Sequence, residues 1–138
     1  MNRAVGQTRD VGYEIGVSRT VPHPPASVWQ FLTSPAGLAI WLGAGAELST
    51  TKGTKYETAD GTIGEVRSFS HLDRLRLTWR PPDWSHDTTL QVAIVGGGNR
   101  TSIRFHQERL ADAEERAGQR AHWQAVSAKV AEVMAGKA

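Results

Sequence analysis

Cysteine is absent from this chain of 138 residues. Its absence excludes disulfide frameworks, thiol nucleophiles and thiolate metal sites. The sequence also lacks any apolar run approaching the ~20 residues that a helix needs to cross a bilayer, and its N-terminus has no signal-peptide core. These absences predict a cytoplasmic protein without a membrane partner.

An excess of charge of one sign is missing as well. The 16 basic and 14 acidic residues give a formal charge of +2, although the calculated pI is 9.3. This balance does not favour nucleic acid as a partner. The length suits one domain that buries roughly two-thirds of its unfolded surface. We expect a flexible tail over residues 1–10 and a single domain over residues 11–138.

A long helix is predicted over residues 113–135, and the rest of the chain is organised around it. Its apolar residues fall on one helical stripe, at Trp123, Val126, Val130, Val133 and Met134. Asp112 and Glu115 have the spacing of a capping box at the helix start. Gly136 follows the last apolar residues and suits a helix end.

Most of the remaining sequence predicts strands, because apolar and polar residues alternate. We expect strands at residues 13–21, 47–50, 54–58, 63–69, 75–80, 90–94 and 101–107. Three prolines between residues 22 and 25 end the first strand and open a short helix, and Ser34-Pro35 begins a second. Asp60-Gly61 predicts a two-residue hairpin turn. Such a meander should be antiparallel, with the long helix covering its concave face.

Several short motifs recur here in the order and spacing of a known family. They are Pro25 to Trp29, Leu38 with Trp41 to Gly43, Asp60-Gly61 with Gly64 to Val66, Leu75 to Trp79, Thr101 to Gln107, and His122-Trp123. From about residue 13 onward the chain resembles the SRPBCC or START-like superfamily, most closely its Aha-type branch, named after the activator of the ninety-kilodalton heat-shock-protein ATPase. The resemblance implies an α+β helix-grip (Bet v-like) fold. A curved antiparallel sheet of about six to seven strands would wrap round the long C-terminal helix, with two short helices after the first strand.

The resemblance also ranks three functions. Members of this superfamily usually enclose a hydrophobic or aromatic small molecule between the sheet and the last helix, so a ligand-binding protein comes first. A stress-related co-chaperone-like module comes second, because the eukaryotic activator has a further domain that we do not find in this chain. A small hydrolase or cyclase-like enzyme comes third. The expected partners are a small hydrophobic molecule or a chaperone, with no cofactor, and the protein would be a monomer or a homodimer.

Five residues are candidates for lining a ligand site: Trp41, Trp79, Trp84, Gln119 and His122. Trp79 shares the apolar face of its strand, and Gln119 and His122 lie in or beside the stripe of the long helix. A buried amide or imidazole needs a polar partner, which a ligand can supply. The alternatives are core filling for Trp41 and Trp79, and solvent or a loop carbonyl for Gln119 and His122. Trp84 is either a lid or an exposed ring.

The sequence supports catalysis and metal binding less well than ligand binding. An enzyme needs more than one acid or base facing the cavity, and only His122 qualifies, so no catalytic residue is assigned. His106 and Glu108 alternate on one strand with a spacing that can hold a metal, but no third ligand is evident and no metal site is predicted. The basic candidates for a chaperone contact, on the polar face of the sheet, are Arg76, Arg80, Arg104 and His106.

Overall fold

The computed structural model describes residues 7–8 and 12–136. Its elements are β1 (Gln7–Thr8), β2 (Gly12–Val21), α1 (Pro25–Thr33), α2 (Pro35–Trp41), β3 (Lys55–Glu57), β4 (Ile63–Ser70), β5 (Arg74–Trp79), β6 (Thr88–Gly97), β7 (Arg100–Leu110) and α3 (Ala113–Met134). The strands form one antiparallel sheet in the order β1-β2-β7-β6-β5-β4-β3. The predicted α+β helix-grip architecture is therefore confirmed. Most of the tail expected over residues 1–10 lies outside the described residues, and Gln7–Thr8 pair with β2.

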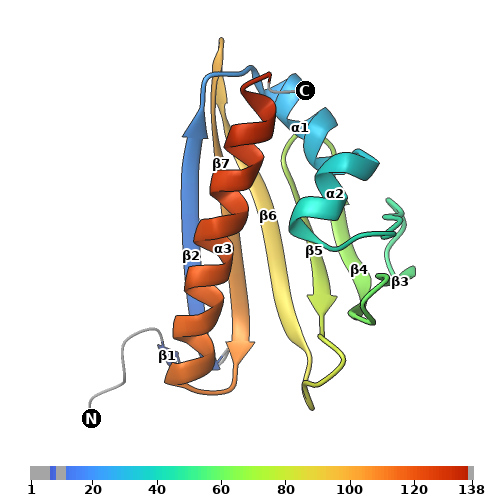
Figure 1. Cartoon of the computed structure of the whole chain (residues 1–138). Helices are drawn as coiled ribbons and strands as arrows, with labels where there is room; N and C mark the ends of the chain where they lie inside the picture. The colour runs from blue at the N-terminus through green and yellow to red at the C-terminus, as the bar shows by residue number, and fades with distance from the viewer. Residues whose placement is uncertain (1–6, 9–11, 137–138) are drawn as a thin grey trace.

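All three helices lie on one face of the sheet (Figure 1). The long helix α3 packs on β2 and β7, α1 packs on β6 and β7, and α2 contacts α3. Strands β5, β6 and β7 turn alternate side chains into this layer, as the period of two requires. Trp123 and Val130 of α3 are fully buried against them. The core therefore fills the space between the sheet and the helices.

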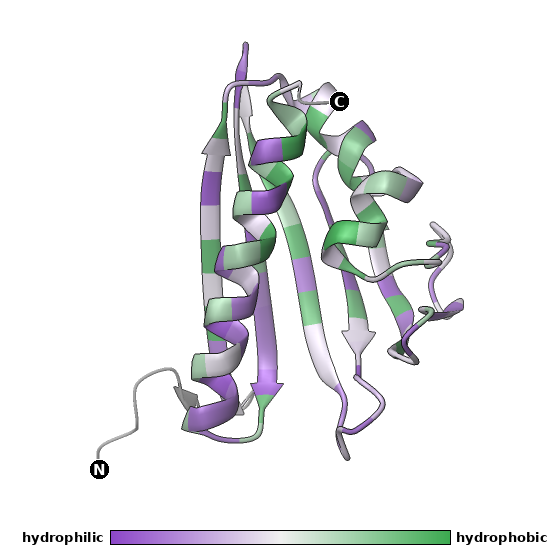
Figure 2. Ribbon diagram, viewed as in Figure 1, coloured by the Kyte–Doolittle hydropathy of each residue, from purple (hydrophilic) through white to green (hydrophobic). Residues whose placement is uncertain are grey.

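Local sequence sets both ends of α3. The side chain of Asp112 accepts a hydrogen bond from the Glu115 amide at 2.8 Å, as the capping box predicts. Glu115 in turn accepts from the Ala111 amide at 2.9 Å, one residue earlier than the box requires. Gly136 adopts a φ of 85°, which favours glycine, and its amide donates to the Val133 carbonyl. Apolar residues gather toward the C-terminal half of α3, and its first turns are mainly hydrophilic (Figure 2).

Two local predictions are wrong. Asp60-Gly61 lies in a loop of five residues, 58–62, which joins β3 to β4, so it is not a two-residue turn. Gly61 has the positive φ expected of a turn glycine, while the Asp60 carboxylate accepts a hydrogen bond from the Thr58 hydroxyl and so closes a longer loop. That hydrogen bond holds the pKa of Asp60 below its usual value. Residues 47–50, expected as a strand, form an irregular connection.

Candidate functional site

The candidate site is built around Trp79, the last residue of β5. Its alternation with two buried leucines turns the ring toward the helices, where the residue is only 7% exposed. The ring centroids of Trp84, Trp123 and His122 lie 5.5, 6.1 and 6.2 Å from that of Trp79. We define the Trp79 cluster as the aromatic side chains that meet here from β5, α3 and the loop over residues 81–87: Trp79, Trp84, His86, His122 and Trp123.

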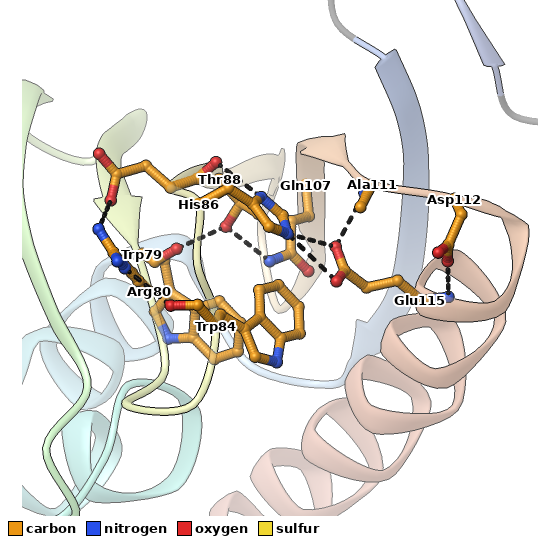
Figure 3. A network of polar contacts seen from close by, with 10 residues as sticks. Trp79, Arg80, Trp84, His86, Thr88, Gln107, Ala111, Asp112 and Glu115 are labelled. Atoms are coloured by element: carbon orange, nitrogen blue, oxygen red, sulfur yellow. Dashed lines mark hydrogen bonds and ion pairs between the residues drawn. The ribbon is translucent and has the colours of Figure 1, made fainter.

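Contacts within and beside the 81–87 loop fix the position of Trp84 (Figure 3). Arg80 Nε donates to the Trp84 carbonyl at 2.9 Å. The His86 ring stacks on Trp84 with a centroid distance of 5.3 Å. His86 Nε2 also lies 3.1 Å from the carboxylate of Glu115 in the first turn of α3. The loop is thus tied to the start of the long helix by one histidine–carboxylate contact.

A chain of buried hydrogen bonds links Trp123 to the backbone of Trp79, and Figure 3 shows its part from Gln107 through Thr88 to Trp79. Trp123 Nε1 donates to Gln107 Oε1 at 2.8 Å, and Gln107 Nε2 donates to Thr88 Oγ1 at 2.9 Å. Thr88 Oγ1 donates to the Trp79 carbonyl at 2.7 Å. Gln107 and Thr88 are fully buried. No role was predicted for Gln107, although it is the next inward position after two apolar residues of β7. That alternation is the signal that locates it.

Two buried polar atoms near the cluster have no hydrogen-bond partner within the part of the chain that the structure describes. They are the donor Trp79 Nε1 and the acceptor Gln119 Oε1. Gln119 lies one turn before Trp123 on α3, so the two side chains share one face of the helix. Buried polar atoms without partners are rare in native proteins and cost about 1–3 kcal/mol each. Trp79 therefore has one donor, and Gln119 one acceptor, to offer to another molecule.

His122 contacts the cluster from its edge. Its ring centroid lies 4.7 Å from that of Trp123, while much of the residue is open to solvent. Partial burial of the ring lowers the pKa of His122 below its ordinary value of 6.5. The imidazole is therefore neutral at neutral pH and offers one donor and one acceptor.

Trp41 lies apart from this site. It is 2% exposed, and its Nε1 donates to the Leu32 carbonyl at 2.8 Å. No ring contact among the described residues joins it to the Trp79 cluster. Its side chain thus fills the core where α1 meets α2, and its polar atom is already satisfied. Of the five predicted site residues, ring contacts bring together Trp79, Trp84 and His122, and Gln119 lies one helical turn before Trp123.

The interior beside the cluster is closed in this structure. The rings of Phe105 and Trp123 stack with a centroid distance of 5.1 Å and fill the space between β7 and α3. Trp84 meets the edge of Trp79 in a T-shaped contact. A molecule that packs against Trp79 on this side would therefore have to displace Trp84.

Two more titratable groups lie here, His86 in the cluster and Glu115 next to it. His86 and Glu115 contact each other, and Glu115 also accepts from the Ala111 amide. Both groups are therefore engaged in holding the loop and the helix start. Among the titratable side chains of the cluster, His122 is the one that makes no hydrogen bond within the described residues.

The sequence profile of the family "Activator of Hsp90 ATPase homolog 1-like protein" matches residues 22–135. The chain belongs to this family. No curated protein matches the chain significantly. In the described part of this family member, no helix combines the length and the apolar character needed to cross a membrane.

Solved structures share the fold at low sequence identity. DynU16, a protein of the dynemicin biosynthetic locus, is 22% identical over 89% of this chain, with a TM-score of 0.75. This chain spans 47% of DynU16, about half its length. An HSP90 activator from Plasmodium falciparum is 19% identical over 70% of this chain and 72% of its own, with a TM-score of 0.60. The Aha1 dimer from Colwellia psychrerythraea is 14% identical over 86% and 93%, with a TM-score of 0.70.

Proposed function

We propose that this family member binds a small, flat and mainly apolar molecule at the Trp79 cluster. The observation that carries the proposal is the pair of buried polar atoms without partners, Trp79 Nε1 and Gln119 Oε1. Small-molecule sites are mostly apolar and aromatic, with a few polar groups that orient the ligand. The cluster has that composition.

The two atoms without hydrogen-bond partners determine which polar groups the proposed ligand should carry. Trp79 Nε1 needs an acceptor, and Gln119 Oε1 needs a donor. A cyclic amide carries both groups on neighbouring atoms, and an aromatic ring fused to it would pack against the tryptophan rings. We therefore name aromatic lactams and related flat heterocycles as the ligand class. A buried water would satisfy the same two atoms, and the experiment below separates these cases.

Entry to the site would require the 81–87 loop to open. Trp84 covers the edge of Trp79, and the contact between His86 and Glu115 links the loop to α3. This contact is a single hydrogen bond between two half-buried side chains, which contributes about 1–3 kcal/mol, so the loop can still open. Opening would uncover the side of Trp79 that Trp84 contacts.

The test compares two probes of similar shape, 2-quinolinone and naphthalene. The lactam should quench tryptophan emission and raise the melting temperature through linkage, whereas naphthalene should do so much more weakly because it lacks the donor and the acceptor. Equal responses to the two probes would mean that the site binds through apolar contacts alone, without use of the donor and the acceptor. A null response to both would remove the proposal and favour the buried water.

Variants locate the binding. Gln119→Leu removes the acceptor at similar volume, and Trp79→Phe removes the donor while it keeps an aromatic ring. Both should weaken binding of 2-quinolinone. Gln124→Leu is the matched control, because Gln124 is an exposed glutamine on the same helix. Loss of binding in the control would place the probe elsewhere on α3.

A co-chaperone role is the second candidate, since an HSP90 activator from Plasmodium falciparum shares the fold. Of the basic residues expected to serve it, Arg76, Arg80 and His106 bind partners within the chain. Arg104 is exposed and has no partner among the described residues. Binding of the ninety-kilodalton chaperone at low salt, lost in Arg104→Glu and at high salt, would support this role. A homodimer, as in the Colwellia protein, is tested by light scattering.

A further inference from the structure

A second group of polar side chains lies on the opposite face of the sheet from the Trp79 cluster. Glu14 of β2 and His106 and Glu108 of β7 each offer one ligand atom, and these atoms lie within 4.8 Å of one another. Glu14 Oε1 is 2.7 Å from His106 Nε2, and His106 Nδ1 is 4.0 Å from Glu108 Oε2. All three residues are half-buried. We call them the outer triad.

An irregularity in the pairing of β2 with β7 brings the outer triad together. The register shifts at Glu14, so that this residue faces a stretch of β7 with one extra residue. Arg109 lies in this irregular stretch of β7 and has a φ of 69°. The carbonyl of Glu14 accepts a hydrogen bond from Arg116 Nε at 2.7 Å, which holds its main chain from the helix side. Its carboxylate is thereby left on the outer face beside His106.

His106 lies between the two glutamates, with its Nε2 hydrogen-bonded to Glu14 and its Nδ1 on the side of Glu108. At 4.0 Å, His106 Nδ1 and Glu108 Oε2 are too far apart for a hydrogen bond. Two ligands of a tetrahedral zinc ion stand roughly 3.3 Å apart, given bonds of about 2.0–2.1 Å. One nitrogen of His106 and one oxygen of each glutamate lie within 4.8 Å of one another. A shift of these side chains by roughly 1 Å would bring the three atoms to the spacing of zinc ligands, with the ion on a single ring nitrogen.

Space for further ligands lies beside His106. Gly16 pairs with it across the strands, and a side chain carbon added there would come within 3.8 Å of the ring. A hollow of about 490 Å³ on this face is lined in part by Gly16 and His106. Water can thus reach the triad and complete the coordination shell.

We propose that Glu14, His106 and Glu108 bind a divalent transition-metal ion of the zinc type, with water as a further ligand. One imidazole and two carboxylates are ligands that zinc accepts. The ion would join β2 to β7 at the place where the register shifts. The sequence offered His106 and Glu108 alone, and the fold adds Glu14 from 92 residues away.

The contacts of Arg76 support an alternative explanation, which the experiment has to distinguish from metal binding. Arg76 Nη2 lies 3.2 Å from Glu108 Oε1 and Arg76 Nη1 donates to Gln91. The same contacts fit an alternative without a metal, a network of polar side chains in which Glu108 is paired with Arg76. An ion-pair network holds no zinc, so direct binding decides between the two.

The experiment titrates the full chain, stripped of metal with EDTA, with zinc sulfate in a calorimeter. We expect saturable binding of one ion per chain and a rise in melting temperature that EDTA reverses. Cobalt(II) should bind in place of zinc and give the visible absorption of a nitrogen- and oxygen-ligated ion. Absence of saturable binding would overturn the proposal.

Two variants and a control assign the ligands. Glu14→Gln and His106→Gln should each weaken zinc binding by roughly tenfold or more. His71→Gln should leave it unchanged, since His71 is an exposed histidine outside the triad. The melting temperature of each variant in EDTA shows that it is folded before its affinity is compared. Zinc binding unchanged in both ligand variants would also overturn the proposal.

Discussion

The two inward-facing glutamines, Gln107 and Gln119, should respond in opposite ways to the same substitution. Gln107 is fully buried, and both ends of its amide are hydrogen-bonded, to Trp123 and to Thr88. Gln119 has a buried carbonyl without a partner in the described chain. Replacement by leucine keeps the approximate volume and removes the amide in each case.

Gln107→Leu breaks two buried hydrogen bonds and leaves the Trp123 N–H without an acceptor. A buried donor left unsatisfied costs about 1–3 kcal/mol, so we expect a loss of about 2 kcal/mol in the free energy of unfolding. Gln119→Leu breaks no hydrogen bond within the described residues and removes a buried acceptor that is already unsatisfied. We expect a gain of about 1 kcal/mol, because the desolvation cost of that carbonyl is removed. The two variants should therefore differ by about 3 kcal/mol.

Urea unfolding measures both values, since a domain of this size usually unfolds in two states. The dependence of the free energy on urea should stay the same in wild type and variants, and the midpoint should move. A Gln119→Leu variant that loses as much stability as Gln107→Leu would refute the reasoning. It would mean that the Gln119 carbonyl is hydrogen-bonded in solution. A stable variant that no longer binds 2-quinolinone would instead mark Gln119 as a residue kept for binding.

Three further predictions follow from single features of the fold. Truncation from Ala121 onward removes three buried apolar side chains of α3, each worth roughly 1.5–3 kcal/mol; because a domain is stable by only ~5–15 kcal/mol, the truncated chain should lose its cooperative melt in circular dichroism. The pKa of His122 is lower in the folded state than 6.5, so the unfolded chain takes up the proton first and stability should fall as the pH drops below 6.5; melting curves across this pH range should show a smaller loss for His122→Asn. In Gly64→Ala the new methyl would lie 2.0 Å from the Thr78 carbonyl oxygen, and a loss of about 2 kcal/mol or more is expected in urea unfolding; an unchanged midpoint would mean that β4 shifts away from β5 without cost.

Much of the fold could be predicted from local sequence patterns. Alternation placed Leu75, Leu77 and Trp79 on the inner face, and the stripe on the long helix identified Trp123 as a core residue. Caps and prolines located the helix ends, because those signals act within one turn of the backbone. The turn at Asp60-Gly61 was predicted wrongly, since the hydrogen bonds of its longer loop involve residues on both sides of the dipeptide.

Which side chains meet was decided by the tertiary structure. Trp79, Trp84 and His122 each carried a local signal, yet their meeting depends on how the 81–87 loop and α3 pack against the end of β5. The contact between Glu14 and His106 depends on a register shift between strands that are far apart in the sequence. Periodicity in a sequence records only which face of an element is buried. Pairing between elements depends on register, loop path and packing, and these are settled only when the whole chain closes around its core.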